Sequence, residues 1–264
     1  MITIAITNAK GGVAKTTTAL CVSSFLAEKG QRTLVLDIDP QANASKSLLE
    51  LEIGEAVEAP TMQDVLYQYI MEKRNNIIKS AIRPIRDNLF LLPAALGMEQ
   101  FKDLVKSHSK RPMEVLKNLV KPIEKQFDYL VIDCPADLSI YVENAIELAD
   151  YILCPSTYDF YGIDGLSLLI PTIQEIKGDE FEDYRVLYTL FNSRATKIQA
   201  KLKEYADALD EELGKVLPFQ IPIDQSIKNS QADNSDIMTS KSYKNTNARH
   251  AYEKLGHFVL ENWN

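Results

Sequence analysis

Residues 10–17, Lys-Gly-Gly-Val-Ala-Lys-Thr-Thr, have the residue types and spacing of a loop that binds phosphate groups. They follow the apolar stretch 2–6 and open a helical pattern near Thr16. Glycines let main-chain N–H groups approach a polyphosphate closely, and the positive end of a following helix favours an anion. In such a loop Lys15 would reach the terminal phosphates, and the Thr16 hydroxyl would ligate Mg²⁺. The residues expected to contact the polyphosphate are Lys10, Gly11, Gly12, Val13, Ala14, Lys15, Thr16 and Thr17.

Two other motifs end apolar stretches with carboxylates. Residues 33–38 contain Asp37 and run into Asp39, and residues 129–132 run into Asp133. Ligands of open α/β sheets bind at the carboxyl ends of the strands, where a carboxylate can hold a metal or position an attacking water. Either motif alone is equally typical of a turn after a strand. Behind a phosphate loop, the two motifs predict a site for phosphoryl transfer, with Asp133 as a Walker B aspartate that holds Mg²⁺ through a water.

The elements that must position these motifs alternate between strand and helix. The alternation indicates βαβ units, and the nearly continuous apolar strands indicate a sheet that is covered on both faces. The predicted fold class is therefore α/β, a doubly wound, mostly parallel sheet with helices on both faces, of the P-loop NTPase type. The expected strands are 2–7, 33–38, 88–92, 129–133, 151–155, 185–191 and 216–221, and the expected helices are 16–29, 61–72, 113–127 with a kink at Pro122, 139–148, 165–177, 198–213 and 248–261.

The domain organisation is expected to be simple. The sequence has no repeat, no low-complexity tract and no linker long enough to divide it, so residues 1–264 are expected to form a single domain. Residues 52–60 and 229–240 are polar or mixed and are expected to be loops.

The composition argues against several classes of protein. The 264 residues carry a net charge of −8 and are 45% hydrophobic, which suffices for a core and argues against a chain that is basic all over. No apolar run approaches the roughly 20 residues of a membrane span, and no signal peptide is recognised. Cys21, Cys134 and Cys154 lack the spacing of metal ligands. They are expected to be buried free thiols in a cytoplasmic protein.

Together the three motifs resemble those of the ParA/MinD group of ATPases, which have a deviant Walker A loop. That loop has a lysine, two glycines, two further residues and then Lys-Thr-Thr, as in residues 10–17. Residues 37–45 are similar to the family's first switch segment, and residues 128–136 are similar to its Walker B strand. Ala14 departs from the glycine of the ordinary phosphate loop, and Ala136 stands where the family usually has a second proline. No helix-turn-helix segment precedes the loop, as in the short ParA/Soj-type members.

The resemblance implies roles for individual residues. Lys10 would be the signature lysine, which crosses a dimer interface to the partner's nucleotide. Asp39 would be the carboxylate on which hydrolysis depends, with Asp37 as its supporting neighbour. The expected catalytic residues are thus Lys10, Lys15 and Asp39, the expected Mg²⁺ ligands are Thr16, Asp39 and Asp133, and the remaining nucleotide contacts are an adenine-contacting Asn192 and Pro222 on the last nucleotide-side loop.

The function that the resemblance implies is partition of a plasmid or chromosome. ATP and Mg²⁺ would close a sandwich homodimer, the dimer would bind DNA without sequence choice, and a ParB-like centromere-binding protein or cargo adaptor would stimulate hydrolysis and release. The protein would then be cytoplasmic and nucleoid-associated. Residues 237–252 carry basic side chains and no carboxylate, which is typical either of phosphate contacts or of an ordinary solvated surface. The candidate DNA contacts are Lys241, Lys244 and Arg249, with Lys197, Lys201 and Lys203 as additional candidates.

Other functions stay open as alternatives. A MinD-like membrane regulator of cell division would carry a basic amphipathic C-terminal helix, whereas residues 253–264 contain two glutamates and little basic charge. A nucleoid-based ATPase that positions a cargo other than DNA would share all three motifs. An iron–sulfur reductase would place cluster cysteines at a dimer axis, and an amide-forming synthetase would bring a substrate pocket of its own; the sequence has no motif for either.

Overall fold

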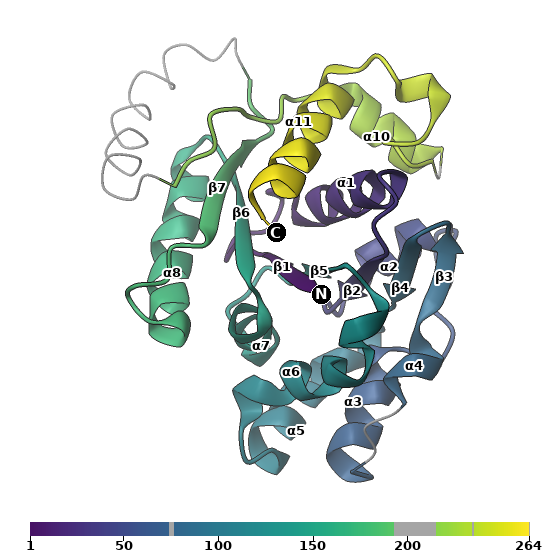
Figure 1. The fold of residues 1–264 in the computed structure, drawn as a ribbon, viewed down its shortest axis with the longest axis vertical. Helices are drawn as coiled ribbons and strands as arrows, with labels where there is room; N and C mark the ends of the chain where they lie inside the picture. The colour runs from purple at the N-terminus through teal and green to yellow at the C-terminus, as the bar shows by residue number, and fades with distance from the viewer. Residues whose placement is uncertain (74–76, 193–214, 234, 264) are drawn as a thin grey trace.

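A central sheet of seven strands organises the part of the chain that the computed structural model describes, residues 1–73, 77–192, 215–233 and 235–263 (Figure 1). The strand order is β3-β4-β2-β5-β1-β6-β7, and only the edge pair β3 and β4 is antiparallel. The strands are β1 (Ile2–Ile6), β2 (Thr33–Asp37), β3 (Arg83–Arg86), β4 (Leu89–Leu92), β5 (Tyr129–Asp133), β6 (Tyr151–Thr157) and β7 (Tyr184–Thr189). The predicted helix 198–213 and the candidate contacts Lys197, Lys201 and Lys203 lie outside the described residues.

Helices cover both faces of this sheet (Figure 1). On one face lie α1 (Lys15–Glu28), α10 (Gln225–Ala232) and α11 (Asn247–Asn262). On the other face lie α3 (Met62–Met71), α5 (Phe101–His108), α6 (Val115–Val120), α7 (Ile140–Leu148) and α8 (Phe160–Lys177). Two short helices, α2 (Asn43–Leu48) and α4 (Ile78–Ala81), complete the described set. Within the described ranges, no helix combines the length and the apolar character that crossing a membrane requires.

The strand residues alternate between the two cores, as a doubly wound sheet requires. In β1, Ile4 and Ile6 pack in the core beneath α1 and α11, whereas Ala5 packs in the core on the opposite face. In β5, Val131 packs in the core beneath α1 and α11, and Leu130 packs in the core on the opposite face. All five side chains are fully buried, because a parallel sheet with helices on both faces leaves no solvated side. The predicted fold class is confirmed.

Some predicted elements differ from the observed ones. The predicted helix 113–127 is divided into α6 and a 3₁₀ segment, Lys121–Gln126, because Pro122 cannot continue an α-helix. The predicted strand 216–221 is wrong, since this stretch makes only an isolated bridge between Val216 and Val186. The predicted loop 229–240 is wrong over its first residues, which belong to α10.

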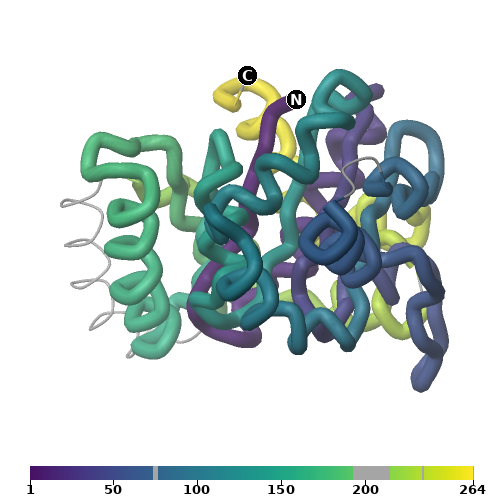
Figure 2. The backbone as a smooth tube through the Cα atoms, turned by 90° about the horizontal axis from the view of Figure 1, so that it is seen from below, coloured from purple at the N-terminus to yellow at the C-terminus, as the bar shows by residue number. Residues whose placement is uncertain are grey.

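The C-terminal helix is fixed against the first helix and the sheet. Gly256 lies so close to the Phe25 ring of α1 that a Cβ there would come within 2.2 Å of it. The Trp263 ring stacks on Tyr151 of β6 with centroids 5.0 Å apart. Both ends of the chain lie on the same side of the molecule, as Figure 2 shows.

Candidate nucleotide site

The phosphate loop joins β1 to α1 through two residues in the left-handed region. Gly12 has φ 78° and Ala14, immediately before α1, has φ 62°. Alanine in this region costs about 1–2 kcal/mol, because its Cβ approaches the following carbonyl oxygen. The departure from glycine that the sequence shows at position 14 is therefore accommodated by a strained alanine and not by a different loop path.

The ends of β6 and β7 hold this loop in place. The Asn8 side chain donates to the Pro155 carbonyl at 2.7 Å and accepts from the Lys10 N–H at 3.0 Å. On the other side, the Thr189 hydroxyl donates to the Val13 carbonyl at 3.0 Å. These contacts hold the loop against two strands, β6 and β7, so its backbone is arranged before any ligand binds.

The two lysines of the loop lie in different surroundings. Lys15 is only 7% exposed, and its ammonium donates to the Lys10 carbonyl at 2.7 Å. Burial lowers the pKa of Lys15, and the nearby Asp133 carboxylate opposes that shift. The Lys10 side chain is exposed instead, and its ammonium lies 5.1 Å from the centre of the Tyr161 ring.

Asp37 and Asp39, at the end of β2, differ in burial and in hydrogen bonding. The buried Asp37 carboxylate accepts from the Ser45 N–H and hydroxyl, at 2.8 and 2.6 Å, and from the Asp39 N–H at 3.0 Å. Burial raises the pKa of Asp37 to about 6, although these hydrogen bonds act in the opposite direction. Asp39 is less buried, and among the described residues its carboxylate accepts a hydrogen bond only from the Gln41 N–H. Asp37 therefore stabilises the segment after β2, from Asp39 to Ser45, whereas the Asp39 carboxylate has lone pairs available for a ligand.

Asp133 ends β5 beside both other motifs. It pairs in register with Asp37 of β2 and with Ile6, which precedes the phosphate loop. Its carboxylate is fully buried, and neither oxygen has a hydrogen bond of normal geometry to a described residue. Burial, followed by the charge of Asp37, raises the pKa of Asp133 well above its usual value, while the Thr16 side chain and Lys15 lower it.

This arrangement fits Mg²⁺. A buried carboxylate without full hydrogen bonding is costly unless a cation or donor compensates it. Asp133 and Thr16 supply the oxygen donors that Mg²⁺ prefers. In the described part of the chain, no three His, Cys, Asp or Glu side chains form a complete metal cage. Mg²⁺ suits such a site because it keeps several waters and binds through one or two carboxylates together with substrate phosphates.

The residues expected on the adenine side come together from distant parts of the sequence. The Phe191 N–H donates to the Ile221 carbonyl, and the Ile223 N–H donates to the Phe191 carbonyl, both at 3.0 Å. This pairing brings Asn192, just beyond β7, next to the Pro222 loop. The family resemblance predicts that both residues contact the nucleotide, and the fold places them side by side.

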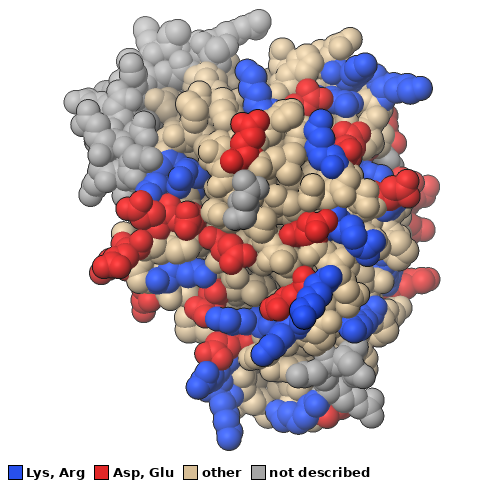
Figure 3. All heavy atoms as spheres, viewed as in Figure 1, with Lys and Arg blue, Asp and Glu red and all other residues tan. Residues whose placement is uncertain are grey.

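The three candidate DNA contacts are not equivalent. Lys241 and Lys244 are exposed, whereas the Arg249 side chain is 12% exposed. Its guanidinium pairs with Glu253 at 3.0 Å and donates to the Ser240 carbonyl at 3.1 Å. On the face in Figure 3, basic and acidic side chains are interspersed and no broad basic surface is visible.

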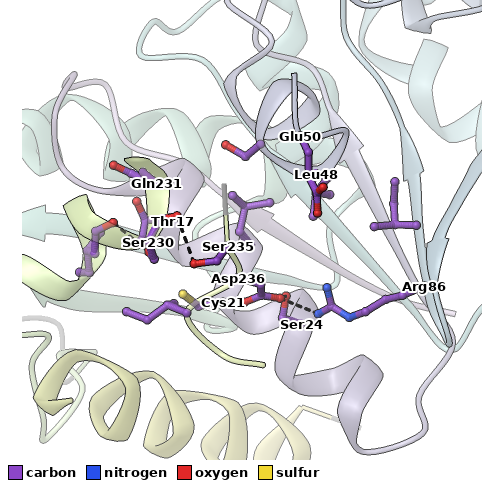
Figure 4. Close-up of a pocket in the computed structure, with 15 residues that line it drawn as sticks. Thr17, Cys21, Ser24, Leu48, Glu50, Arg86, Ser230, Gln231, Ser235 and Asp236 are labelled. Atoms are coloured by element: carbon purple, nitrogen blue, oxygen red, sulfur yellow. Dashed lines mark hydrogen bonds and ion pairs between the residues drawn. The ribbon is translucent and has the colours of Figure 1, made fainter. Parts of the chain in front are cut away.

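A cavity of about 110 Å³ lies along another side of α1 (Figure 4). Thr17, Cys21 and Ser24 of α1 contribute to its wall. Asp236 accepts from the Ser24 hydroxyl and from Arg86, each at 2.6 Å, and so ties the chain before α11 to β3. Pockets for drug-sized ligands have about 300–1,000 Å³, so this cavity is too small for a nucleotide. Its Cys21, like Cys134 and Cys154, is a buried free thiol, as predicted.

Sequence reasoning missed several supporting residues. Ser45, which donates hydrogen bonds to Asp37, lies within the switch segment 37–45, so the motif itself could have indicated its role. Lys102 of α5 pairs at 2.7 Å with Asp137 in the loop after β5, and nothing in the local sequence links the two. Tyr161, beside Lys10, was also missed, because only the fold brings α8 to the phosphate loop.

Comparison with known proteins supports a family assignment. A family model described as "AAA domain" matches residues 1–186, which include the phosphate loop and all three aspartates. An uncharacterized protein of Methanocaldococcus jannaschii is 32% identical over 265 residues, covering 99% of both chains. The sporulation initiation inhibitor protein Soj of Bacillus subtilis is 30% identical over 211 residues, 76% of this chain and 79% of that protein. The chromosome partitioning protein ParA of Myxococcus xanthus is 29% identical and covers 81% of this chain, which covers 74% of that protein.

Solved structures share the fold over the whole chain. A complex of a Cyanothece McdA variant with ATP has a TM-score of 0.81 at 23% identity, covering 99% of this chain and 96% of that one. Cobyrinic acid a,c-diamide synthase of Mycobacterium smegmatis, with bound ADP and magnesium, has a TM-score of 0.77 at 24% identity, covering 100% and 95%. At these identities the likeness concerns the fold, and the sequence relatives carry the assignment. The chain belongs to the ParA/MinD family of P-loop ATPases.

Proposed function

We propose that the protein is a partition or positioning ATPase, in which Mg²⁺-ATP drives dimerisation and non-specific binding to DNA. The observation that carries the proposal is the convergence of the phosphate loop, Asp39 and Asp133 at the ends of three neighbouring strands. The relative that is named for chromosome partitioning supports it, and the ATP and the ADP with magnesium in the similar structures support these cofactors. A ParB-like or cargo-adaptor protein would stimulate hydrolysis, and the protein would act in the cytoplasm on the nucleoid.

The proposed nucleotide contacts follow the geometry of the loop. The backbone of residues 10–17 and the Lys15 ammonium bind the phosphates, while Asn192 and Pro222 flank the base. Thr16 and, through water, Asp133 hold Mg²⁺, with Asp39 near it to position the attacking water. Bound Mg²⁺ supplies neutralising charge on the β- and γ-phosphates. The buried Asp37 keeps the Asp39 backbone in place through their hydrogen bond.

The different exposure of the two lysines supports an active site that two subunits share. Lys15 is held inside its own loop, so it serves the nucleotide of its own subunit. Lys10 is exposed on the same loop, and it is proposed to reach a phosphate on a facing copy. An added cation at the terminal phosphate stabilises developing charge, so hydrolysis would depend on dimerisation.

Binding to DNA is proposed to use Lys241 and Lys244, with Arg249 holding their segment through Glu253 and Ser240. Two exposed lysines on a chain of net charge −8 form a weak site. Pairing two such sites in one dimer raises the overall affinity without any new contact. Contacts to phosphates alone would be sensitive to salt and independent of base sequence.

The packing of α11 weighs against a MinD-like membrane function. Its apolar residues Tyr252, Leu255 and Val259 are fully buried in the core with α1. A membrane-binding amphipathic helix must present its apolar side to lipid. In this chain that side is already occupied.

Retention on non-specific DNA tests the proposal. Wild-type protein is expected to bind DNA with ATP and Mg²⁺, to lose binding with ADP, and to bind less at higher salt. A Lys241→Ala/Lys244→Ala double variant should bind weakly in both states, whereas Lys125→Ala, an exposed lysine outside the segment, should bind normally. Equal retention with ATP and ADP would contradict the proposal. Retention on liposomes with ATP would favour the membrane alternative.

A further inference from the structure

The Lys10 ammonium lies over an aromatic ring of its own subunit. Its Nζ is 5.1 Å from the centroid of the Tyr161 ring, within the range of a cation–π contact. Tyr161 is the second residue of α8, and Asp159 caps this helix by accepting from the Gly162 N–H at 2.8 Å. The cap holds the backbone that carries Tyr161, beside the lysine that the proposed function assigns to the partner's nucleotide.

The approach of α8 to the loop is built into the backbone. A Cβ at Gly165 would lie 2.6 Å from Asn8 Oδ1 and 3.1 Å from Lys10 Cβ, so glycine permits this close packing. Asn8 Oδ1 also accepts from the Lys10 N–H. Both the backbone and the side chain of Lys10 are therefore placed against the same helix.

The aromatic residues at this helix end do not serve the core. Tyr161 and its neighbour Phe160 are each 68% exposed. Their rings pack edge to face, with centroids 6.2 Å apart. Of these two rings, only that of Tyr161 makes a cation–π contact with Lys10 among the described residues. A substitution at either position should leave the fold intact, so their functional effects can be compared.

We propose that Tyr161 is a positioning residue that holds the Lys10 ammonium on its own subunit until a second copy of the chain presents a nucleotide phosphate. This inference rests on the proposed role of Lys10 across the dimer. An exposed cation–π contact is weaker than a charge-assisted hydrogen bond to phosphate, so the exchange favours the phosphate once the two copies meet. Until then, the contact opposes association, because each Lys10 must first leave its ring.

The dimer dissociation constant with a non-hydrolysable ATP analogue and Mg²⁺ tests this inference. Removing the ring in Tyr161→Leu should tighten the dimer by about 2- to 5-fold for each lysine released. Tyr161→Phe keeps the ring and should match the wild type. Phe160→Leu, equally exposed on the same helix, is the matched control and should also match it. In a Lys10→Ala background, Tyr161→Leu should have no effect.

A dimer that is unchanged or weaker in Tyr161→Leu would overturn the inference, as would equal tightening with and without Lys10. NMR of the nucleotide-free protein gives a separate reading of the contact. The Lys10 ε-methylene protons should show a ring-current shift in wild type and Tyr161→Phe that Tyr161→Leu loses, and the lack of that shift would also overturn it. If wild type shows the shift but forms no dimer with the analogue, the proposed function fails, and with it any positioning role, although the contact itself exists.

Discussion

At the scale of single residues, the nucleotide site contains groups whose placement lowers stability. Ala14 adopts a left-handed conformation that suits glycine, and Asp133 is a buried carboxylate beside Asp37. Natural proteins tolerate such strain where a ligand needs the geometry. Relieving the strain at Ala14 or removing the buried charge of Asp133 should therefore raise the stability of the protein.

Replacing Ala14 by glycine should stabilise the protein. Relief of the left-handed alanine gains about 1–2 kcal/mol, and the added freedom of glycine in the unfolded chain takes back roughly half of it. Chemical denaturation measures the change. Ala19→Gly, in the right-handed interior of α1, is the control and should destabilise. A loss of stability in Ala14→Gly would show that the loop does not strain this alanine.

Replacing Asp133 by asparagine should also stabilise the protein without ligands, by roughly 1–3 kcal/mol, because a buried and poorly compensated carboxylate is removed. The same change should abolish Mg²⁺-dependent ATP hydrolysis. Denaturation without nucleotide or metal, together with steady-state hydrolysis, separates the two effects. A destabilised Asp133→Asn would mean that the carboxylate has a structural partner in the folded protein.

At the scale of elements, the sequence predicts well what is local. The helix predicted over residues 61–72 is observed as α3, and the Thr61 N–H before it donates to Asp64 at 2.8 Å in a capping box. Where a kink is predicted at Pro122, α6 ends at Val120 and a 3₁₀ segment follows, Lys121–Gln126. The sequence fails where tertiary contacts decide: β3 is short, contains Pro84, and becomes a strand only because β4 offers it an edge. Residues 216–221 look like a strand, but only one bridge to β7 forms there.

Asp224 is expected to stabilise two helices at once. Its carboxylate accepts from the Ser226 N–H of α10 at 2.9 Å and from the Ala248 N–H of α11 at 3.1 Å. Asp224→Ala should lower the free energy of unfolding by about 1–2 kcal/mol, because both helix ends lose a cap. Asp224→Asn keeps an acceptor and should lose much less. If the two variants unfold at the same denaturant concentration, the side chain does not act as a cap.

At the scale of the whole molecule, the three motifs meet because β2, β5 and β1 are neighbours in the sheet. The sequence indicates that each of Lys15, Asp39 and Asp133 follows a strand, and the parallel fold then requires their ends to share one edge. The sequence does not give the strand order. Contacts such as Tyr161 with Lys10 or Lys102 with Asp137 are therefore visible only in the folded chain. The periodicity of the sequence does not predict such contacts, because their partners are distant in sequence.

The central claim is that a nucleotide in the loop of one subunit needs Lys10 from another. Mixing Lys10→Ala protein with Asp39→Ala protein tests it most directly through ATP hydrolysis. In a mixed dimer, one site combines an intact Asp39 with Lys10 from the facing subunit. Two proteins that are inactive alone should then recover up to about a quarter of wild-type activity in an equal mixture, since half the dimers are mixed and each has one complete site. No recovery, with both proteins folded and able to bind ATP, would contradict the account.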